Sequence, residues 1–482
     1  GPQSQDRRQA RQEQPPLQPE TPVTQADTIA AIATPPGMGG IGIVRASGPD
    51  AERIGKALFR PRTATRPFQT RRLTHGEIRC PATGRVLDEV LAVFMRAPHS
   101  FTGEDTLEIH CHGGPLILEE VLLAVLRAGA RPAEPGEFTR RAFLNGRLDL
   151  AQAEAVQEMI TARSPRGLDL ALGNLRGDLS RRIGELRASI LDILTLLEAE
   201  IDFQEEEGLE AAPREGLLDG LRDITARIGE LTATYGEGRM IREGARVVIT
   251  GKANVGKSSL FNRLLGENRA IVTPHAGTTR DYLEEGATIR GIPVRYVDTA
   301  GIREAQDPAE QEGIERVWRQ SASADVVVIV LDGSIPLTQE DRDVLAANRD
   351  RNTIVTINKS DLPAVLAEES LPGELAGREI FRVSAKTGEG LAALRDGVHS
   401  AIGRAVGPGH ADAVLTTLRH KIALEGAFAC LRKAEQGLSG GLSPEFAAFD
   451  LREALGALGE VTGQTVSEEV LDRIFSTFCI GK

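Results

Sequence analysis

The feature that most constrains the fold is a glycine-rich loop between a strand-like run and a helical pattern. The run ARVVIT (245–250) leads directly into GKANVGKSS (251–259), which fits the pattern G-x-x-x-x-G-K-[ST]. Such a loop curls backbone N–H groups around phosphate oxygens at the start of a helix. A glycine-rich turn without a ligand is the alternative, but the strand before the loop and the helix after it favour phosphate binding.

Apolar runs and helical patterns alternate after this loop. The runs predict strands at 292–297, 325–331, 352–357 and 379–383, and the helical patterns lie near 310–321, 338–349 and 391–403. Strands separated by helices form a mostly parallel sheet that is covered on both faces. We therefore predict an α/β domain over residues 244–404.

Further motifs supply the phosphate and magnesium side of a GTP site. Lys257 and Ser258 end the loop pattern, so that Lys257 offers a charge to the outer phosphates and Ser258 a hydroxyl to Mg²⁺. In GTTR (277–280), Thr279 offers a second hydroxyl to the ion. In DTAG (298–301), the Asp298 carboxylate can hold the shell of the ion, and the amide of the final glycine can sense the γ-phosphate.

Two more motifs indicate that the base is guanine. NKSD (358–361) ends a strand, and the Asp361 carboxylate can accept hydrogen bonds from the N1–H and the exocyclic amine of guanine. Adenine lacks this pair of donors. SAK (384–386) closes the base pocket. Five motifs in this order predict a GTP-hydrolysing switch domain.

One position departs from Ras-like switches. They carry a water-orienting glutamine after DTAG, and Ile302 stands there in this chain. Another group must therefore position the water. The residues alone leave four candidates, Glu304, Asp307, Glu310 and Glu312.

The rest of the chain divides into an α+β part and a helical part. Residues 26–145 alternate short β-like runs with helical patterns. The β-like runs are 29–34, 41–47, 90–96 and 106–112, and the helical patterns are 50–58 and 115–129. Residues 147–240, 412–435 and 445–478 carry helical patterns instead. The simplest arrangement inserts the α/β domain into a helical domain.

Composition limits the class of protein. A chain of 482 residues suggests about three domains. The net charge of -12 argues against coating nucleic acid by bulk electrostatics. No run approaches the length of an apolar membrane span, and four cysteines without a CxxC pair predict a reducing, cytoplasmic location. Residues 1–25 are rich in Gln, Pro and Arg and are predicted to be a disordered leader.

Several segments give the chain a family resemblance. They are ATPPGMGGIGIVR (33–45), FTGEDTLEIHCHGGP (101–115), PGEFTRRAFLNGRLDLAQAEAV (135–156), the GTP motifs and FCIGK (478–482). With these segments the sequence resembles the MnmE family of tRNA modification GTPases, also called TrmE. The resemblance covers nearly the whole chain after the leader.

The resemblance implies a multidomain α/β protein with an inserted Ras-like P-loop G domain. The expected parts are a leader at 1–25, an N-terminal α+β domain for folate binding and dimerisation at 26–146, a helical domain at 147–243 and 405–482, and the G domain at 244–404. The family modifies carbon 5 of the wobble uridine of certain tRNAs with an aminomethyl-type group. It uses 5-formyl- or 5,10-methylene-tetrahydrofolate and forms a homodimer that joins the flavoprotein MnmG in a heterotetramer.

The resemblance also assigns roles in the G domain. K⁺ would be held by Asn254, Thr273, His275 and Thr278, and Glu310 would orient the water. For Asn254 a loop-capping role is the alternative. The expected contacts of GTP are Asn254, Val255, Gly256, Lys257, Ser258, Ser259, Thr273, Thr278, Thr279, Asp298, Thr299, Ala300, Gly301, Asn358, Lys359, Asp361, Ser384 and Ala385, with Mg²⁺ on Ser258 and Thr279.

For the folate, the resemblance selects Arg45, Glu108, Arg147 and Lys482. The family more often has lysine where this chain has Arg147, which keeps the charge and changes the geometry. Chemically, Arg45 suits the glutamate carboxylates of the cofactor and Glu108 suits the N–H donors of the pterin. Ordinary surface charges on a strand are the alternative for both.

The resemblance makes Cys479 a thiol that the modification reaction needs and that the helical domain presents toward the folate pocket. A buried structural cysteine is the alternative. A prenylation box is excluded because Lys482 is not a usual final residue. The triplet His110-Cys111-His112 offers too few ligands for a metal site.

Two other functions stay open at this point. Ribosome-assembly GTPases of the Era or EngA type share the P-loop, GTTRD and NKSD, but carry an RNA-binding domain after the G domain. A GTP-dependent scaffold without chemistry of its own is the second alternative. Binding of a reduced folate would separate both from a tRNA modification GTPase.

Overall fold

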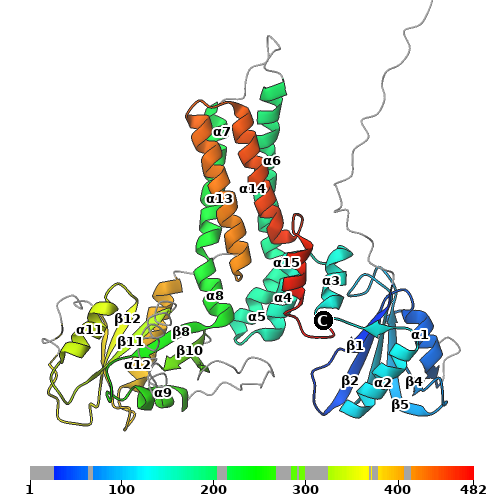
Figure 1. Cartoon of the computed structure of the whole chain (residues 1–482), viewed down its shortest axis with the longest axis horizontal. Helices are drawn as coiled ribbons and strands as arrows, with labels where there is room; N and C mark the ends of the chain where they lie inside the picture. Colours follow the sequence, from blue (N-terminus) through cyan, green and yellow to red (C-terminus); the bar gives the residue numbers. More distant parts are fainter. Residues whose placement is uncertain are drawn as a thin grey trace, which may run out of the picture. The chain divides into compact units, whose positions relative to one another are not determined.

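The computed structural model describes residues 27–62, 69–202, 214–266, 284–289, 292–298, 324–367, 371, 378–406 and 414–482 (Figure 1). The predicted leader at 1–25 lies outside them. The contacts divide the chain into two compact units. The first unit contains residues 27–149 together with Gln464–Lys482, and the second is Leu150–Gly463. None of the described helices is long and apolar enough to cross a membrane.

A seven-stranded sheet forms the centre of the first unit, with the order β3-β4-β5-β6-β2-β1-β7. All neighbours are antiparallel except β1 and β7. The strands are β1 (Ile29–Ile32), β2 (Gly39–Ser47), β3 (Phe59–Pro61), β4 (Thr74–Arg79), β5 (Val86–Met95), β6 (Thr106–Gly113) and β7 (Arg131–Pro132). The four predicted strands are confirmed, and β3, β4 and β7 were not predicted.

Helices cover this sheet on both faces. Helices α1 (Ala51–Leu58) and α2 (Pro115–Arg127) pack on the face to which Ala30 points. The residues on either side of Ala30 in β1, Ile29 and Ala31, point to the opposite face, where they pack with Phe138 of α3 (Glu137–Leu144). This period of two is what an extended strand imposes on its side chains. Helix α15 (Glu468–Phe475) also belongs to this unit and packs on α3.

The second unit begins and ends in helices. They are α4 (Leu150–Thr161), α5 (Pro165–Leu175), α6 (Asp178–Asp202), α7 (Arg214–Ala233), α8 (Tyr235–Glu243), α13 (Leu418–Ser439) and α14 (Pro444–Thr462). Figure 1 shows α13 and α14 alongside α6 and α7, although residues 234–417 separate the two pairs in the sequence. An apolar stripe of α6, from Leu186 to Leu197, is buried in the helical core. Residue Gly463, with a left-handed backbone (φ 86°), ends α14.

A six-stranded sheet with the order β13-β12-β11-β8-β10-β9 forms the G domain of the second unit. Its elements are β8 (Ala245–Thr250), α9 (Lys257–Gly266), β9 (Glu284–Ile289), β10 (Ile292–Asp298), β11 (Val326–Asp332), α11 (Gln339–Ala347), β12 (Thr353–Asn358), β13 (Ile380–Arg382) and α12 (Leu391–Val406). All strand pairs are parallel except β9 with β10. The predicted helix near 310–321 lies outside the described residues.

The burial of β11 explains why its sequence is a continuous apolar run. Val326, Val328 and Val330 belong to one core cluster, and Val327 and Ile329 belong to another on the opposite face. A strand with a core on both faces cannot alternate apolar and polar residues. The prediction of a mostly parallel, doubly covered sheet is therefore confirmed.

Candidate functional site

Three of the predicted GTP motifs begin at one edge of the G-domain sheet. β8 runs into the loop 251–259, β10 ends at Asp298, and β12 ends at Asn358. Because the carboxyl ends of parallel strands meet at the same edge, the loop 251–259, Asp298 and Asn358 lie at the same edge of the sheet. The register pairs Asp298 with Ile249, so that DTAG begins beside the phosphate-binding loop.

The backbone of this loop has the shape that a phosphate cradle requires. Gly251 and Gly256 have positive φ angles of 149° and 95°, and a residue with a side chain would be strained in this conformation. A Cβ on Gly251 would collide with the carbonyl of Val330, and one on Gly256 would collide with the amide of Asn358. Helix α9 begins at once with Lys257, so its N-terminal amides face the same space. These residues fit a nucleotide phosphate.

Lys257 and Asn254 have defined positions in this loop. The Lys257 side chain is buried, and its Nζ donates to the carbonyl of Lys252 at 2.6 Å. Asn254 is exposed and has a left-handed backbone (φ 62°), which asparagine tolerates better than most residues. Its backbone therefore shapes the loop, and its side chain stays available for a ligand.

Asn358 connects the phosphate loop to the base loop. Its Nδ2 donates to the carbonyl of Val255 at 2.8 Å, and its Oδ1 accepts from the Ala385 amide at 3.0 Å. With 2% exposure, the Asn358 side chain is fully enclosed. One buried amide thus holds the phosphate loop and the base loop, because both its nitrogen and its oxygen make a hydrogen bond within the protein.

The two charged residues of NKSD are each held by a partner. Lys359 Nζ lies 2.6 Å from Asp332 Oδ2, and Ser384 Oγ donates to Asp361 Oδ1 at 2.6 Å. The hydrogen bond from Ser384 lowers the pKa of the Asp361 carboxyl, so this group is ionised at neutral pH. An ionised carboxylate accepts hydrogen bonds and donates none. That is the state a guanine edge requires.

Asp332 and the pair Lys252–Asp341 were not predicted from the sequence. Asp332 closes β11 just as Asp298 closes β10, and that position at a strand end was a usable signal. Lys252 Nζ lies 2.7 Å from Asp341 Oδ2, while Asp341 also caps the first turn of α11. The sequence gives no sign of this second contact, because the two residues are 89 positions apart.

Several predicted site residues lie outside the described residues. They are Thr273, His275, Thr278, Thr279, Thr299, Ala300, Gly301 and Glu310, and the same holds for Glu304, Asp307 and Glu312. Ser258 and Ser259 are exposed in the first turn of α9, and Val255 is the buried residue of the loop.

A second site lies in the first unit, where the C-terminal segment meets the sheet. Arg45 of β2 and Glu108 of β6 are direct cross-strand partners, with Nε 2.8 Å from Oε1. Arg45 also donates from its Nη1 to the carbonyl of Gly481 at 3.2 Å. Both side chains are largely buried, so the pair is no ordinary surface contact.

Lys482 belongs to the same cluster. Burial lowers the pKa of its ammonium group, and the positive charge of Arg45 lowers it further, while Glu108 and Cys479 act in the opposite direction. The structure therefore brings together Arg45, Glu108 and Lys482, three of the four residues predicted for the folate. The fourth, Arg147, donates instead to the carbonyl of Ser100 at 3.2 Å.

Cys479 and Ile480 are exposed, and the residues on either side of this pair, Phe478 and Gly481, are buried. A cysteine kept for packing is normally enclosed, as Cys111 is in β6. Burial raises the pKa of the Cys111 thiol to about 12, which makes it unreactive. The exposure of Cys479 argues against the buried structural role.

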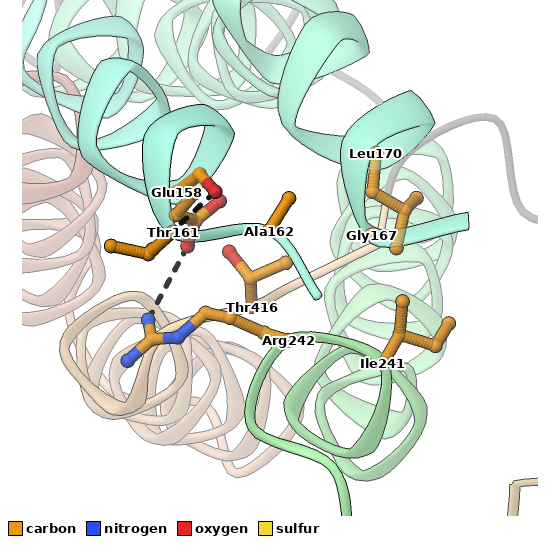
Figure 2. Close-up of a pocket in the computed structure, with 8 residues that line it drawn as sticks. All are labelled: Glu158, Thr161, Ala162, Gly167, Leu170, Ile241, Arg242 and Thr416. Atoms are coloured by element: carbon orange, nitrogen blue, oxygen red, sulfur yellow. Dashed lines mark hydrogen bonds and ion pairs between the residues drawn. The ribbon is translucent and has the colours of Figure 1, made fainter. Parts of the chain in front are cut away.

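The helical part of the second unit contains a separate pocket beside α8 (Figure 2). Arg242 reaches across it to Glu158, with Nη1 3.3 Å from Oε1, and the buried Thr416 hydroxyl has no hydrogen-bond partner among the described residues. The pocket contains no residue predicted for GTP or folate. It is lined by Glu158, Thr161, Ala162, Gly167, Leu170, Ile241, Arg242 and Thr416.

Comparison with known proteins assigns the family. The family model described as GTP-binding protein TrmE N-terminus matches residues 28–147, and the model of the MnmE helical domain matches residues 150–479. The chain belongs to the MnmE family. A tRNA modification GTPase MnmE of Syntrophus aciditrophicus is 51% identical over 456 residues, covering 95% of this chain and 99% of the relative. One from Heliobacterium modesticaldum is 50% identical over 464 residues, with the same coverage of both chains.

Membership of the MnmE family agrees with the geometry of the nucleotide site. The phosphate cradle, the ionised Asp361 and the bridging Asn358 are the parts that a GTP site needs. The chain is thus a GTP hydrolase, and the predictions of the family, the enzyme class and the multidomain α/β fold are confirmed.

Proposed function

We propose that this chain is a K⁺-dependent GTPase that modifies carbon 5 of the wobble uridine of certain tRNAs. It acts with a flavoprotein partner and a reduced folate that donates one carbon. The MnmE relatives named above are tRNA modification GTPases, which supports the tRNA substrate. The observation that carries the proposal is the cluster in which an exposed Cys479 lies beside Lys482, Arg45 and Glu108.

The nucleotide site has one task in this proposal. The loop 251–259 binds the phosphates, and Asp361 with the SAK loop binds guanine. When bound, K⁺ would supply positive charge for the transition state, as an arginine finger does in other GTPases. Asn254 would hold the ion, together with residues 273, 275 and 278. Glu310 would orient the water that Ile302 cannot bind.

The cluster in the first unit has a different task. Arg45 and Glu108 offer a cation and an acceptor to the carboxylates and the N–H donors of a folate. The Cys479 thiol is open to solvent, and it is close enough to Lys482 of the same cluster to affect the charge of that ammonium group. A reduced folate supplies the one-carbon group when bound, while these side chains orient it and keep the thiol close.

A homodimer is part of the proposal, and exposed apolar side chains support it. Met38, Ile41 and Leu116 are 92%, 67% and 73% exposed. The register of β2 with β6 sets Ile41 opposite His112, close to the start of α2. Exposed apolar groups at one end of a sheet are typical of protein interfaces. Sedimentation of Ile41→Asp should show a weaker dimer.

Nucleoside analysis tests the central claim. Cells that lack this chain should lose the aminomethyl-type modification of the wobble uridine, and the wild-type chain should restore it. Cys479→Ser should fail to restore it and should keep GTP hydrolysis. Normal modification with Cys479→Ser would refute the role of this thiol. A ribosome defect with normal tRNA would favour the assembly function instead.

The ion requirement has its own test. GTP turnover should rise strongly when K⁺ replaces Na⁺, by roughly 10²-fold if the ion acts as one electrostatic group at the transition state. Asn254→Ala should remove the response and retain the Na⁺ rate. Equal rates in the two salts would rule out the ion requirement.

A further inference from the structure

The C-terminal segment of the first unit, Gln464–Lys482, packs closely against a glycine at the start of α3. Gly136 has a left-handed backbone (φ 68°), and a Cβ there would lie 2.5 Å from the carbonyl oxygen of Phe475 and 3.0 Å from the Cβ of Phe478. Its N–H also donates to the carbonyl of Cys479 at 3.4 Å. The Phe475 carbonyl therefore approaches this backbone more closely than any Cβ would allow, and the Phe478 contact would be tight.

An arginine one turn further along α3 holds the beginning of α15. Arg140 Nη2 lies 2.6 Å from Glu468 Oε2, and its Nη1 lies 3.0 Å from Asp472 Oδ1. The Phe143 ring lies 6.5 Å from the Phe475 ring. Since positions 136, 140 and 143 lie on one face of the helix, they form a continuous dock for the segment.

The other end of the segment is held by the sheet. A Cβ on Gly481 would collide with the carbonyl of Ile32, and the Gly481 carbonyl accepts from Arg45. Cys479 and Ile480 are thus exposed between two anchored points, Phe478 and Gly481. The position of the thiol depends on both anchors.

We propose that Gly136 and Arg140 are positioning residues for the modification reaction, because they dock α15 so that Cys479 is held beside Arg45 and Glu108. This inference rests on the proposed function, in which the Cys479 thiol takes part in the reaction. Helix α15 covers only Glu468–Phe475, and a helix of that length is not stable alone in water. Its order therefore comes from the dock.

The first test replaces the glycine. Gly136→Ala in the full chain should make the α15 amides exchange hydrogen about tenfold faster, because overpacking of this size displaces a docked element. Wobble-uridine modification should fall with it, while GTP turnover stays at the wild-type rate.

Gly84→Ala is the matched control for the first test. Gly84 has nearly the same backbone (φ 71°), and no described atom lies within 4 Å of the Cβ it would gain. It carries the same backbone strain without the collision. It should leave the exchange of α15 and the modification unchanged.

The second test reverses the charges and does not depend on the glycine. Arg140→Glu should repel Glu468 and Asp472, and the exchange of α15 should rise about threefold, as is reasonable for two exposed ion pairs. Adding Glu468→Arg and Asp472→Arg to Arg140→Glu should restore both docking and modification. A purely structural loss at position 140 would not be rescued in this way.

The outcomes separate the inference from the proposed function. If α15 is released in these variants and tRNA modification stays normal, the positioning role is wrong. It is also wrong if Gly136→Ala and Arg140→Glu both leave the exchange of α15 unchanged. Normal modification with Cys479→Ser instead removes the proposed role of the thiol, while the exchange data still report whether the dock exists.

Discussion

The nucleotide site and the Cys479 cluster, which consists of Arg45, Glu108, Cys479 and Lys482, differ in how their residues are distributed along the chain. The described residues of the nucleotide site lie between 251 and 385, and most follow the end of a strand. In the Cys479 cluster, Arg45 and the carbonyl of Gly481 are 436 positions apart. The first site is built from local motifs on one sheet, and the second exists only when the two ends of the chain meet. Each lies in its own compact unit.

This comparison predicts that the two sites can be disabled separately, and the largest effect is expected at the base pocket. Asp361→Asn replaces an ionised acceptor with a side chain that presents donors to guanine. GTP affinity should fall by about 10⁴-fold, as for other sites that lose a base-specific hydrogen bond. Calorimetric titration of the full chain with GTP would measure this loss.

The Cys479 cluster supplies the control for that variant. The rate at which a maleimide labels Cys479 should stay at the wild-type value in Asp361→Asn. A change in labelling would show that the two units are not independent in this respect.

The second test concerns hydrolysis without loss of binding. Glu310→Ala should slow GTP turnover by about 10²–10⁴-fold, as expected for a water-positioning group or a general base. GTP affinity should stay near the wild-type value, because the side chain acts on the water. Single-turnover kinetics with a binding titration would measure both quantities. Weak binding would mean that a different carboxylate orients the water.

The third test uses acid, which should weaken the helical part of the second unit. Burial alone would raise the pKa of Glu154, but the charge of His420 and a hydrogen bond from Arg419 lower it to about 2, from an ordinary value of 4.5. The stabilisation is therefore complete above pH 4.5 and is lost as the pH falls toward 2. It amounts to about 3 kcal/mol.

Urea unfolding between pH 6 and pH 3 would measure this effect. The wild-type chain should lose more stability over this range than Glu154→Gln, which lacks the titrating group. Parallel losses in the two proteins would contradict the assignment to Glu154.

The smallest expected effect lies in the Cys479 cluster. Arg45→Lys keeps the positive charge but cannot contact Glu108 and the Gly481 carbonyl together. Affinity for 5-formyl-tetrahydrofolate should fall by about tenfold, with no change in GTP affinity. Arg53→Lys, in an exposed pair with Asp50 on α1, should leave both affinities unchanged. A loss of GTP affinity in Arg45→Lys would break the separation of the sites.

The G domain was predictable because its signals are local. Strands such as β11 have a core on both faces, so their sequences are unbroken apolar runs that mark the strand directly. β9 was missed, since its sequence EEGATI carries no such run. In the ion pair of Lys359 with Asp332, only Lys359 was predicted. A motif specifies its own residues, but it does not specify which residues of the neighbouring strand contact them.

For the Cys479 cluster, the residues could be predicted from the sequence, but the way in which the fold brings them together could not. The resemblance selected Arg45, Glu108 and Lys482, but no periodicity indicates that residues 464–482 fold with the first unit. Gly136 shows the reason. Its role depends on an atom of Phe475, more than three hundred positions away, and a single sequence carries no record of such a contact. The domain boundaries at 146, 243 and 404 remain predictions.

The division of the first unit between two distant stretches of sequence also has a consequence for its synthesis. Residues up to 149 leave the ribosome first, and the roughly 300 residues of Leu150–Gly463 need about 15–60 s before Gln464 can follow. During that interval the surface of α3 has no α15 to cover it, and Arg45 has no Gly481 carbonyl to bind. The first unit therefore begins to fold before the second and is completed after it, and a nascent chain should expose its α3 dock to chaperones until residues 464–482 have left the ribosome.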